Sequence, residues 1–299
     1  MFEELKSCQL CPRACGVNRL EGKRGFCGAG DTVKVARAAL HQWEEPCLSG
    51  TRGSGTVFFS YCTLRCVFCQ NYELSTQAKG KEISYEELAE VFLKLQQQGA
   101  HNINLVTPTH YIPQIREALK LAKQQGLDLP IVYNTSGFER RETLSTLRGL
   151  IAIYLPDFKY FKPTYAKKYS HAPNYVSAVK EALGEMVSQV GDATFNEEGL
   201  MVKGVIVRHL MLPGLLFDSK KIITYLYETY GSQIYISMMN QYTPLKIVEA
   251  YPELNKKLNP KHYAFLTDYA MDLGIENGFI QEGETALESF IPPFNEEGV

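Results

Sequence analysis

The feature that most constrains this chain is a set of three cysteines, Cys62, Cys66 and Cys69, separated by three and two residues. Cysteine thiolates are soft ligands that suit iron–sulfur clusters. A four-iron cluster has four iron corners, so three cysteines leave one iron without a protein ligand. That iron can bind a small molecule, and a low-potential cluster can give the molecule an electron. The spacing therefore predicts a [4Fe-4S] cluster with one open coordination position.

Two other interpretations of these cysteines are open. They belong to a zinc site if a fourth ligand comes from elsewhere, because structural zinc takes four ligands. Otherwise they are buried thiols that pack as small hydrophobic side chains. The local context favours the cluster, because residues 53–60 are typical of a glycine turn followed by a short buried strand, and the cysteines come directly after it. In a parallel α/β barrel, sites are built at that end of the strands.

Composition and charge narrow the class of protein. A chain of 299 residues that is 45% hydrophobic can form one barrel-like domain or two ordinary domains. Its net charge of −2 gives no overall positive field for nucleic acid. No run approaches the ~20 apolar residues of a membrane span, and the start lacks the order of a signal peptide. Eight cysteines without an export signal favour metal ligation in a reducing, cytoplasmic compartment over disulfides.

Strand and helix patterns alternate from residue 56 onward. Ser84 and Glu87 predict a capping box at the start of one helix, and Gly99 ends that helix. The predicted strands cover 56–60, 102–106, 129–133, 150–155, 203–207 and 234–238, and the main helices cover 84–98, 113–125, 140–147, 176–190, 219–230 and 260–272. Six βα units with right-handed crossovers predict a partial (β/α)6 barrel, an α/β fold that is open on one side.

Three segments are expected along the chain. Residues 1–50 form a cysteine-rich, metal-binding segment, residues 51–245 form the barrel, and residues 246–299 form a helical extension that covers it. The first segment carries Cys8, Cys11, Cys15 and Cys27, separated by two, three and eleven residues and punctuated by proline and glycine. Such a knuckle suits structural zinc or an auxiliary iron–sulfur cluster, and we slightly favour zinc or an undefined metal. Cys47 is either buried or a replacement ligand.

Seven stretches, in order along nearly the whole chain, resemble one group of the radical S-adenosylmethionine (SAM) superfamily, whose members are similar to pyruvate formate-lyase-activating enzyme. The stretches are 8–19, 53–72, 102–111, 133–137, 155–160, 207–214 and 239–244. The resemblance implies that SAM chelates the open iron. One electron, from a donor such as flavodoxin or ferredoxin, then breaks a sulfonium C–S bond and releases a 5′-deoxyadenosyl radical. The resemblance also implies that Cys62, Cys66 and Cys69 hold the catalytic cluster.

The resemblance extends to residues that contact SAM. Most of the superfamily has a Gly-Gly-Glu-like segment after the second strand, where this chain has Thr107-Pro-Thr-His110. His110 is either a polar contact or a capping or surface histidine. After the third strand, Asn134 stands where the activases have aspartate, so its contact would carry no charge, and Ser136 follows it. We expect Asn134 and Ser136 to bind SAM, although a plain turn is the alternative.

Two further strand ends carry charged candidates. Asp157 and Lys159 lie on the same face by period-two alternation, which suits a zwitterionic ligand such as SAM, and a surface ion pair is the alternative. Arg208 and His209 lie on opposite faces, so at most one points inward. The resemblance favours His209 for SAM or the substrate backbone. Residues 241–242 follow the sixth strand and are expected to close the site.

Three hypotheses about function follow. The first is an oxidoreductase-type activating enzyme that removes a Cα hydrogen from a glycine of a protein partner, as the activases do. The second is a radical SAM enzyme that modifies a peptide or a small metabolite. The third is a non-catalytic protein that uses its cysteines as a structural metal module.

Overall fold

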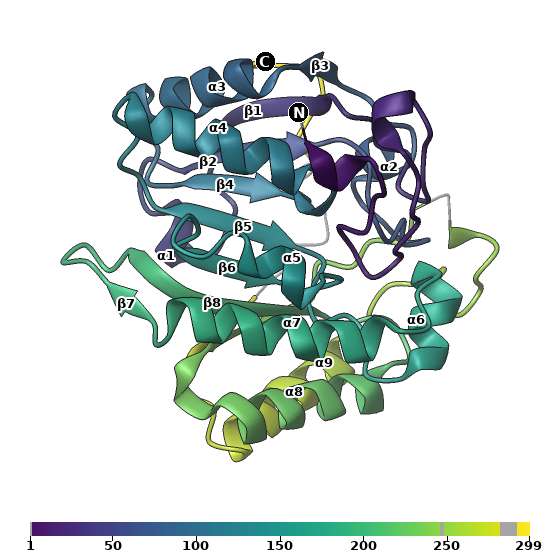
Figure 1. The fold of residues 1–299 in the computed structure, drawn as a ribbon. Coiled ribbons are helices and arrows are strands. Elements are labelled where there is room, and N and C mark those ends of the chain that lie inside the picture. Colours follow the sequence, from purple (N-terminus) through teal and green to yellow (C-terminus); the bar gives the residue numbers. More distant parts are fainter. Residues whose placement is uncertain (1, 246–247, 282–291) are drawn as a thin grey trace.

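A run of parallel strands forms the centre of the structure (Figure 1). The computed structural model describes residues 2–245, 248–281 and 292–299. The central strands, each parallel to the next, are β2 (Ser54–Phe59), β4 (Ile103–Val106), β5 (Ile131–Thr135), β6 (Ile153–Pro156), β8 (Met201–Leu210) and β9 (Tyr235–Met239). Each of the predicted strands overlaps one of these. The predicted α/β partial barrel is therefore confirmed.

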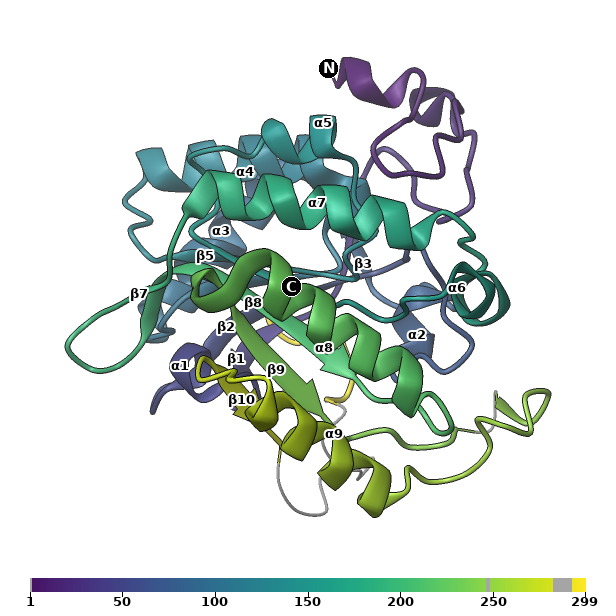
Figure 2. The same cartoon turned by 90° about the horizontal axis from the view of Figure 1, so that it is seen from below.

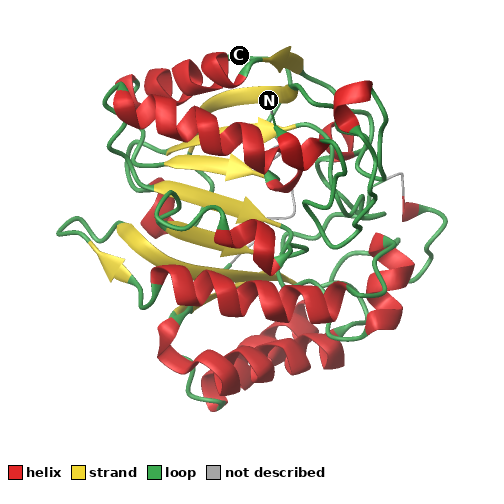
Figure 3. Cartoon of the chain, in the orientation of Figure 1, coloured by secondary structure: helices red, strands yellow, loops and turns green. Residues whose placement is uncertain are grey.

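Helices cover the outer face of this sheet, in front of the strands in Figure 1 and Figure 3. They are α3 (Tyr85–Gln97), α4 (Ile112–Gln124), α5 (Arg141–Ser145), α7 (Tyr175–Val190) and α8 (Leu216–Tyr230). The capping box of α3 is confirmed, because the Ser84 hydroxyl accepts from Glu87 N at 3.1 Å and the Glu87 carboxylate accepts from Ser84 N at 2.7 Å. The apolar stripe of α3 is buried in the main core.

The inner face of the sheet has an apolar cluster of its own. Strand residues such as Val132, Leu155 and Ile206 point to this side, because alternate residues of a strand face opposite ways. The short helix α1 (Pro46–Ser49) supplies Cys47 and Leu48, which pack among them. Burial raises the pKa of the Cys47 thiol to about 12, and Cys47 lines neither of the pockets formed by the other cysteines. Helix α1 therefore acts as a plug in the partial barrel.

Four strands were not predicted. They are β1 (Val33–His41), antiparallel to β2; β3 (Lys81–Ile83), antiparallel to β1; β7 (Thr194–Phe195), paired with β8; and β10 (Gly278–Ile280), parallel to β9. Several alanines and two basic residues obscure the strand pattern in β1. The domain limits at residues 50 and 245 stay a prediction, although β1–β2 and β9–β10 pair across them.

The C-terminal region contacts strands near both ends of the sheet, because β10 pairs with β9 and residues 292–299 contact β1. Helix α9 (Pro260–Asp272) has the predicted bounds and lies beside α8, as the view from below shows (Figure 2). Residues 292–299 return to β1, where Ala38 N donates to Glu297 O at 2.8 Å. Within the described ranges, no helix combines the length and the hydrophobicity needed to cross a membrane.

The plug yields a stability prediction. Leu48 is fully buried in the inner cluster, so Leu48→Ala should lower the free energy of unfolding by about 2–5 kcal/mol, through lost burial and the cavity left behind. Urea unfolding followed by circular dichroism measures this change. The control is Phe217→Ala, which removes a larger side chain that is 78% exposed and should change stability by no more than about 0.5 kcal/mol. Equal losses in the two variants would contradict the role of the plug.

Candidate active site

A cavity of about 340 Å³ opens at the carboxyl ends of the parallel strands. Its lining includes most of the predicted site residues: Cys62, Cys66, Cys69, Asn134, Ser136, Asp157 and Lys159. It also includes Thr107, whose hydroxyl is a candidate contact to SAM, and Arg208 and Glu44, which were not predicted to contact SAM. Because parallel strands end at the same edge, residues far apart in the sequence meet here. The structure thus brings the three cysteines and the charged candidates into one site.

The cysteines of this cavity fit the donor set of a four-iron cluster. All eight cysteines of the chain are free, and Cys62 and Cys66 are buried. Leu64 N donates to Cys62 Sγ at 3.4 Å, and the Ser170 hydroxyl donates to Cys66 Sγ at 2.9 Å. Burial and neighbouring thiols raise the pKa of Cys69 to about 12, while Lys159 opposes the rise. Three soft ligands with hydrogen bonds to sulfur and a nearby cation suit iron.

The loop that carries these cysteines, residues 60–70, is called the cluster loop below. Tyr61 and Arg65 have φ angles of +73° and +53°, in the left-handed region. Each such residue costs roughly 1–2 kcal/mol when it is not glycine, so surrounding contacts must hold the loop in this shape. The backbone of Tyr61 is held by Leu74, whose carbonyl accepts from Tyr61 N at 2.9 Å.

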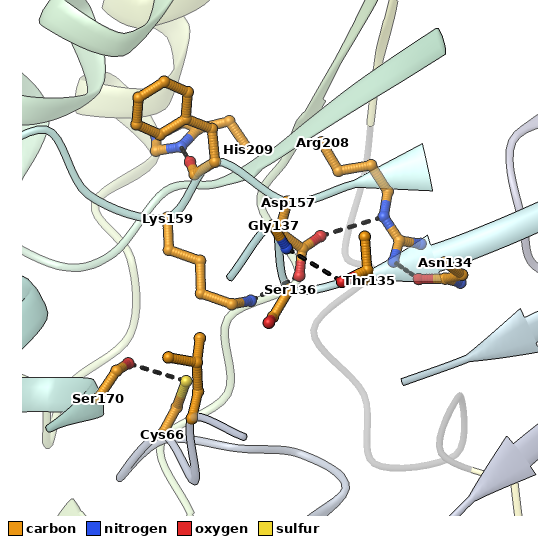
Figure 4. A network of polar contacts seen from close by, with 12 residues as sticks. Cys66, Asn134, Thr135, Ser136, Gly137, Asp157, Lys159, Ser170, Arg208 and His209 are labelled. Atoms are coloured by element: carbon orange, nitrogen blue, oxygen red, sulfur yellow. Dashed lines mark hydrogen bonds and ion pairs between the residues drawn. The ribbon is translucent and has the colours of Figure 1, made fainter. Parts of the chain in front are cut away.

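Opposite the cysteines lies a network of charged and amide groups (Figure 4). The Asp157 carboxylate accepts from Lys159 Nζ at 2.5 Å and from Arg208 Nε at 3.2 Å. Arg208 also donates to Asn134 Oδ1 at 2.6 Å and to the Glu44 carboxylate at 3.1 Å. The Asp157 and Lys159 side chains are only 18% exposed, so they are not a surface ion pair. Their predicted placement on one face is confirmed.

Neighbouring charges hold this network ionised. Burial alone would raise the pKa of Asp157, but Lys159 and Arg208 together lower it. Burial alone would lower the pKa of Lys159 and of Arg208, but Asp157 raises both, and Glu45 and Glu44 add to the rise at Arg208. A low-dielectric site strengthens these attractions. The cavity therefore offers both signs of fixed charge at neutral pH.

The structure puts Arg208, and not His209, on the cavity. Both ring nitrogens of His209 are engaged at 2.8 Å, one with Phe158 O and the other with the Ser219 hydroxyl. Figure 4 shows His209 apart from the network that joins Arg208, Asp157 and Lys159. The alternation of the two residues was predicted, and the choice between them was made by resemblance. The contact of His209 with SAM stays a prediction without geometric support.

Of the candidate SAM contacts in the segment after β4, residues 107–110, only Thr107 lies on the cavity. Thr107, with φ of +60°, lines the cavity. Thr109 instead donates to the buried Glu139 carboxylate at 2.5 Å. His110 is 2% exposed, hydrogen-bonds Ser60 O through Nε2 at 2.7 Å, and lines a different pocket. His110 is therefore neither a contact in this cavity nor a surface histidine.

Glu139 is a buried acid that the sequence analysis missed. Its Oε1 accepts from Thr109 and Thr135 at the ends of β4 and β5, and its Oε2 has no partner in the described residues. Burial raises its pKa to about 7, although these hydroxyl donors oppose the rise. It ties together the loops beside the cavity. Only its position after the Thr-Ser-Gly turn could have drawn attention to it.

The N-terminal cysteines form a second group. Cys8, Cys11, Cys15 and Cys27 line one pocket of about 20 Å³ together with Arg13, Arg19 and His110. Burial raises the pKa of Cys11 to about 12 and also raises that of Cys27. Among the described residues, no three histidine, cysteine or acidic side chains, here or at the first site, converge in an arrangement for a single metal ion. The predicted grouping of the four cysteines is nevertheless present.

Comparison with known proteins identifies the family. Residues 56–215 match the model of the Radical SAM superfamily, and because this is more than half of the chain, the chain belongs to that superfamily. Its members are enzymes that use a [4Fe-4S] cluster and SAM. The match begins in β2 and ends just before α8, so it contains the cluster loop and the charged network.

The chain is also similar to one curated relative in sequence and to solved structures in fold. MJ0674, an uncharacterised protein of Methanocaldococcus jannaschii, is 29% identical over 265 residues, which are 85% of this chain and 71% of the relative. The fold is similar to that of Streptococcus suis SuiB bound to its precursor peptide SuiA, with a TM-score of 0.51 and 14% identity. SuiB bound to SAM has the same TM-score at 15% identity. These matches cover 75% and 74% of this chain but only 47% and 48% of SuiB.

Glu139 yields a prediction of pH dependence. Its pKa rises from an ordinary 4.5 to about 7 on folding, so between these values the unfolded chain holds fewer protons and stability falls as pH rises. This loss is on the order of 3 kcal/mol. Glu139→Gln does not titrate and should show a smaller decrease in unfolding free energy between about pH 4.5 and pH 7. Glu181→Gln, an exposed glutamate on α7, is the control and should keep the wild-type slope.

Proposed function

We propose that this protein cleaves SAM reductively at a [4Fe-4S] cluster held by Cys62, Cys66 and Cys69, and that it removes a hydrogen atom from a protein or peptide partner, as the glycyl-radical activases do. The observation that carries this proposal is the placement of three free cysteines on one cavity with a network of fixed positive and negative charges. When bound, the cluster and SAM supply one electron and a 5′-deoxyadenosyl radical. The protein supplies binding, orientation and charge.

The charged network is suited to hold a zwitterion. Asn134 Oδ1 is used by Arg208, so the amide N–H₂ of Asn134 is the group left to donate to a ligand. Lys159 and Asp157 offer one charge of each sign at the cavity wall, beside the hydroxyl of Ser136. The amino and carboxylate groups of SAM find complementary partners in such a set.

The opposite wall suits a peptide more than a small metabolite. Besides Asn134, four amide side chains line the cavity: Gln70, Asn71, Gln241 and Gln281. Gln281 Nε2 donates to Gln241 Oε1 at 3.0 Å, and Gln70 Nε2 donates to Gln241 O at 3.0 Å, so these amides are held in place. Side-chain amides match the donors and acceptors of a peptide backbone. Trp43, 67% exposed at the same cavity, adds an aromatic surface.

The remaining elements of the proposal are a second metal site and a reductant. Cys8, Cys11, Cys15 and Cys27 bind zinc or an auxiliary iron–sulfur cluster, supported by their shared pocket. A low-potential donor such as flavodoxin or ferredoxin supplies the electron. Free cysteines throughout the chain support a reducing, cytoplasmic setting.

Anaerobic reconstitution tests the proposed reaction. Reduced wild-type protein should convert SAM to 5′-deoxyadenosine and methionine, and SAM should change the EPR spectrum of the reduced cluster. The Cys62→Ala/Cys66→Ala/Cys69→Ala variant should lose about four irons and both signals. A reconstituted wild-type cluster that shows neither product nor a spectral response to SAM would leave only the structural-metal hypothesis. If 5′-deoxyadenosine does form, a glycyl-radical doublet on a partner protein, or modification of a peptide, would exclude the small-metabolite alternative.

A pair of variants tests which residue of β8 serves SAM. Arg208→Gln removes a cation from the cavity and should weaken SAM binding at least about tenfold, equivalent to about 1.4 kcal/mol. His209→Gln alters a side chain packed against Ser219 and Phe158 and should lower stability while leaving SAM affinity nearly unchanged. Isothermal calorimetry on the reconstituted proteins gives both affinities. Loss of affinity in His209→Gln alone would restore the role that the resemblance assigned to His209.

A further inference from the structure

The N-terminal segment, residues 2–32, lies against the cluster loop at the carboxyl ends of the strands (Figure 1). The two segments exchange hydrogen bonds. Arg13 Nε donates to Thr63 O at 2.9 Å, and Arg65 Nη2 donates to Cys27 O at 2.9 Å. In each contact, an arginine that lies between two cysteines of one segment donates to a backbone carbonyl of the other segment. The two cysteine groups are therefore linked through backbone carbonyls.

Arg13 is the main connection. It lies between Cys11 and Cys15 in sequence, and its guanidinium also donates to His171 O at 2.6 Å and to Ser170 O at 3.1 Å. The Ser170 hydroxyl in turn donates to Cys66 Sγ. The guanidinium stacks 3.6 Å from the centre of the Phe26 ring, which fixes its plane. One side chain thus connects the N-terminal segment with the residue that contacts a cluster sulfur.

The N-terminal segment approaches the cluster loop most closely at Tyr61 and Arg65, the two loop residues with left-handed backbone. A Cβ on Gly28 would lie 2.8 Å from Arg65 Nη2 and 3.1 Å from Tyr61 Cδ1, and Gly28 itself has φ of +87°. Only glycine allows this approach. Tyr61 and Arg65 are the residues whose conformation needs support from outside the loop. The N-terminal segment provides that support.

The N-terminal segment has few apolar contacts of its own. Its described regular structure is two 3₁₀ turns, and its buried hydrophobic residues are Leu5, Leu10 and Ala29. A segment with so little core normally needs a disulfide or a metal, and its four cysteines are free. His110 lines the cysteine pocket, and its buried Nδ1 has no hydrogen-bond partner among the described residues, which points to a missing group nearby.

Packing brings the cysteines together on one side of the pocket. A Cβ on Gly25 would lie 2.9 Å from Cys15 Sγ, so glycine is needed for Cys15 to occupy its place. The buried Arg19 guanidinium contacts Cys8 Sγ at 3.8 Å and donates to His110 O at 2.7 Å. A guanidinium beside sulfur is a suitable partner for the negative charge of a metal-bound thiolate group.

We propose that a thiolate-bound metal centre on Cys8, Cys11, Cys15 and Cys27 locks the N-terminal segment and, through Arg13, Gly28 and Arg65, holds the cluster loop in the conformation that binds the first cluster. The inference rests on the proposed function only in that the first cluster exists on Cys62, Cys66 and Cys69. In this arrangement Arg13 is a positioning residue. Loss of the second metal therefore loosens the first cluster, although none of the first cluster's ligands has changed.

The first experiment establishes the metal. In the Cys62→Ala/Cys66→Ala/Cys69→Ala background, purified anaerobically, metal analysis should find bound zinc or iron with sulfide. Adding Cys11→Ala and Cys15→Ala should abolish that metal. Zinc alone identifies a structural ion, and iron with sulfide identifies an auxiliary cluster; either result supports the proposal. Equal metal content with and without the two N-terminal substitutions overturns it.

The second experiment tests the link, with all ligands of the first cluster intact. In Cys11→Ala/Cys15→Ala and in Arg13→Gln, the first cluster should lose iron to a chelator several times faster than in wild type, and its EPR spectrum with SAM should change. Lys23→Gln, the same charge change on a side chain that is 67% exposed, should match wild type. Wild-type chelation rates and spectra in Arg13→Gln overturn the link. If the double cysteine variant does not fold, Arg13→Gln alone provides the test.

The two proposals fail separately. Wild-type protein that makes no 5′-deoxyadenosine contradicts the proposed reaction, but chelation rates still report whether the N-terminal segment holds the cluster. Arg13→Lys keeps the charge but offers fewer donors in a less fixed geometry, so it should restore the chelation rate only in part.

Discussion

The structure at the mouth of the barrel depends on one carboxylate, Asp157. It lies at the end of β6 between two largely buried cations, Lys159 and Arg208, whose side chains are 18% and 17% exposed and need a partner of opposite charge. Arg208 also reaches Glu44 beside the plug and Asn134 at the end of β5. The ends of three strands and the plug are thereby held together by charge-assisted hydrogen bonds. The same pairing keeps a cation beside the cysteines, where bound iron–sulfur thiolates would place negative charge.

Below this mouth the packing inside the barrel is mainly apolar. The inner cluster around Leu48 and the outer core beneath the helices are apolar, and they supply the stability of the fold. Many polar side chains line the cavity at the carboxyl ends of the strands, whereas Ser54 and Asn102, at the amino ends, are buried and hydrogen-bonded to each other. A rigid apolar scaffold with a polar rim is the arrangement that preorganises a site, because the site residues need not move to meet a ligand.

The N-terminal segment is joined to this site by polar contacts more than by apolar packing. Its guanidinium groups donate to backbone carbonyls of other segments, and Gly28 allows the N-terminal segment to approach the cluster loop closely. Such contacts are directional, so they transmit the position of one segment to the other more sharply than apolar contact does. This explains why the two cysteine groups, separated by the whole of β1 and β2 in sequence, lie next to one another in the structure.

Much of the fold was predictable from local pattern. The capping box of Ser84 and Glu87 and the bounds of α9 followed from short-range signals, and the six βα units followed from alternation of strand and helix. Strand β1 was missed because its alanines give no strong period, and its partner β2 lies beyond a turn and the plug. The grouping of Asp157 and Lys159 was predictable because alternation within one strand fixes their shared face.

The sequence by itself determined which residue types carry the chemistry: three cysteines at a spacing that leaves one iron open, four more in a compact knuckle, and charged residues at strand ends. Only the tertiary structure decided which of them share a site. In the structure Arg208 points into the cavity and His209 points away from it, and Glu139 is buried against Thr109 and Thr135. His110 lies at the pocket of the N-terminal cysteines, and Arg13 lies between the two cysteine groups. The physical reason is that the spacing of residues in the sequence determines only local geometry. Which face of a strand points inward, and which distant loops come into contact, depends on how the whole sheet curves and packs.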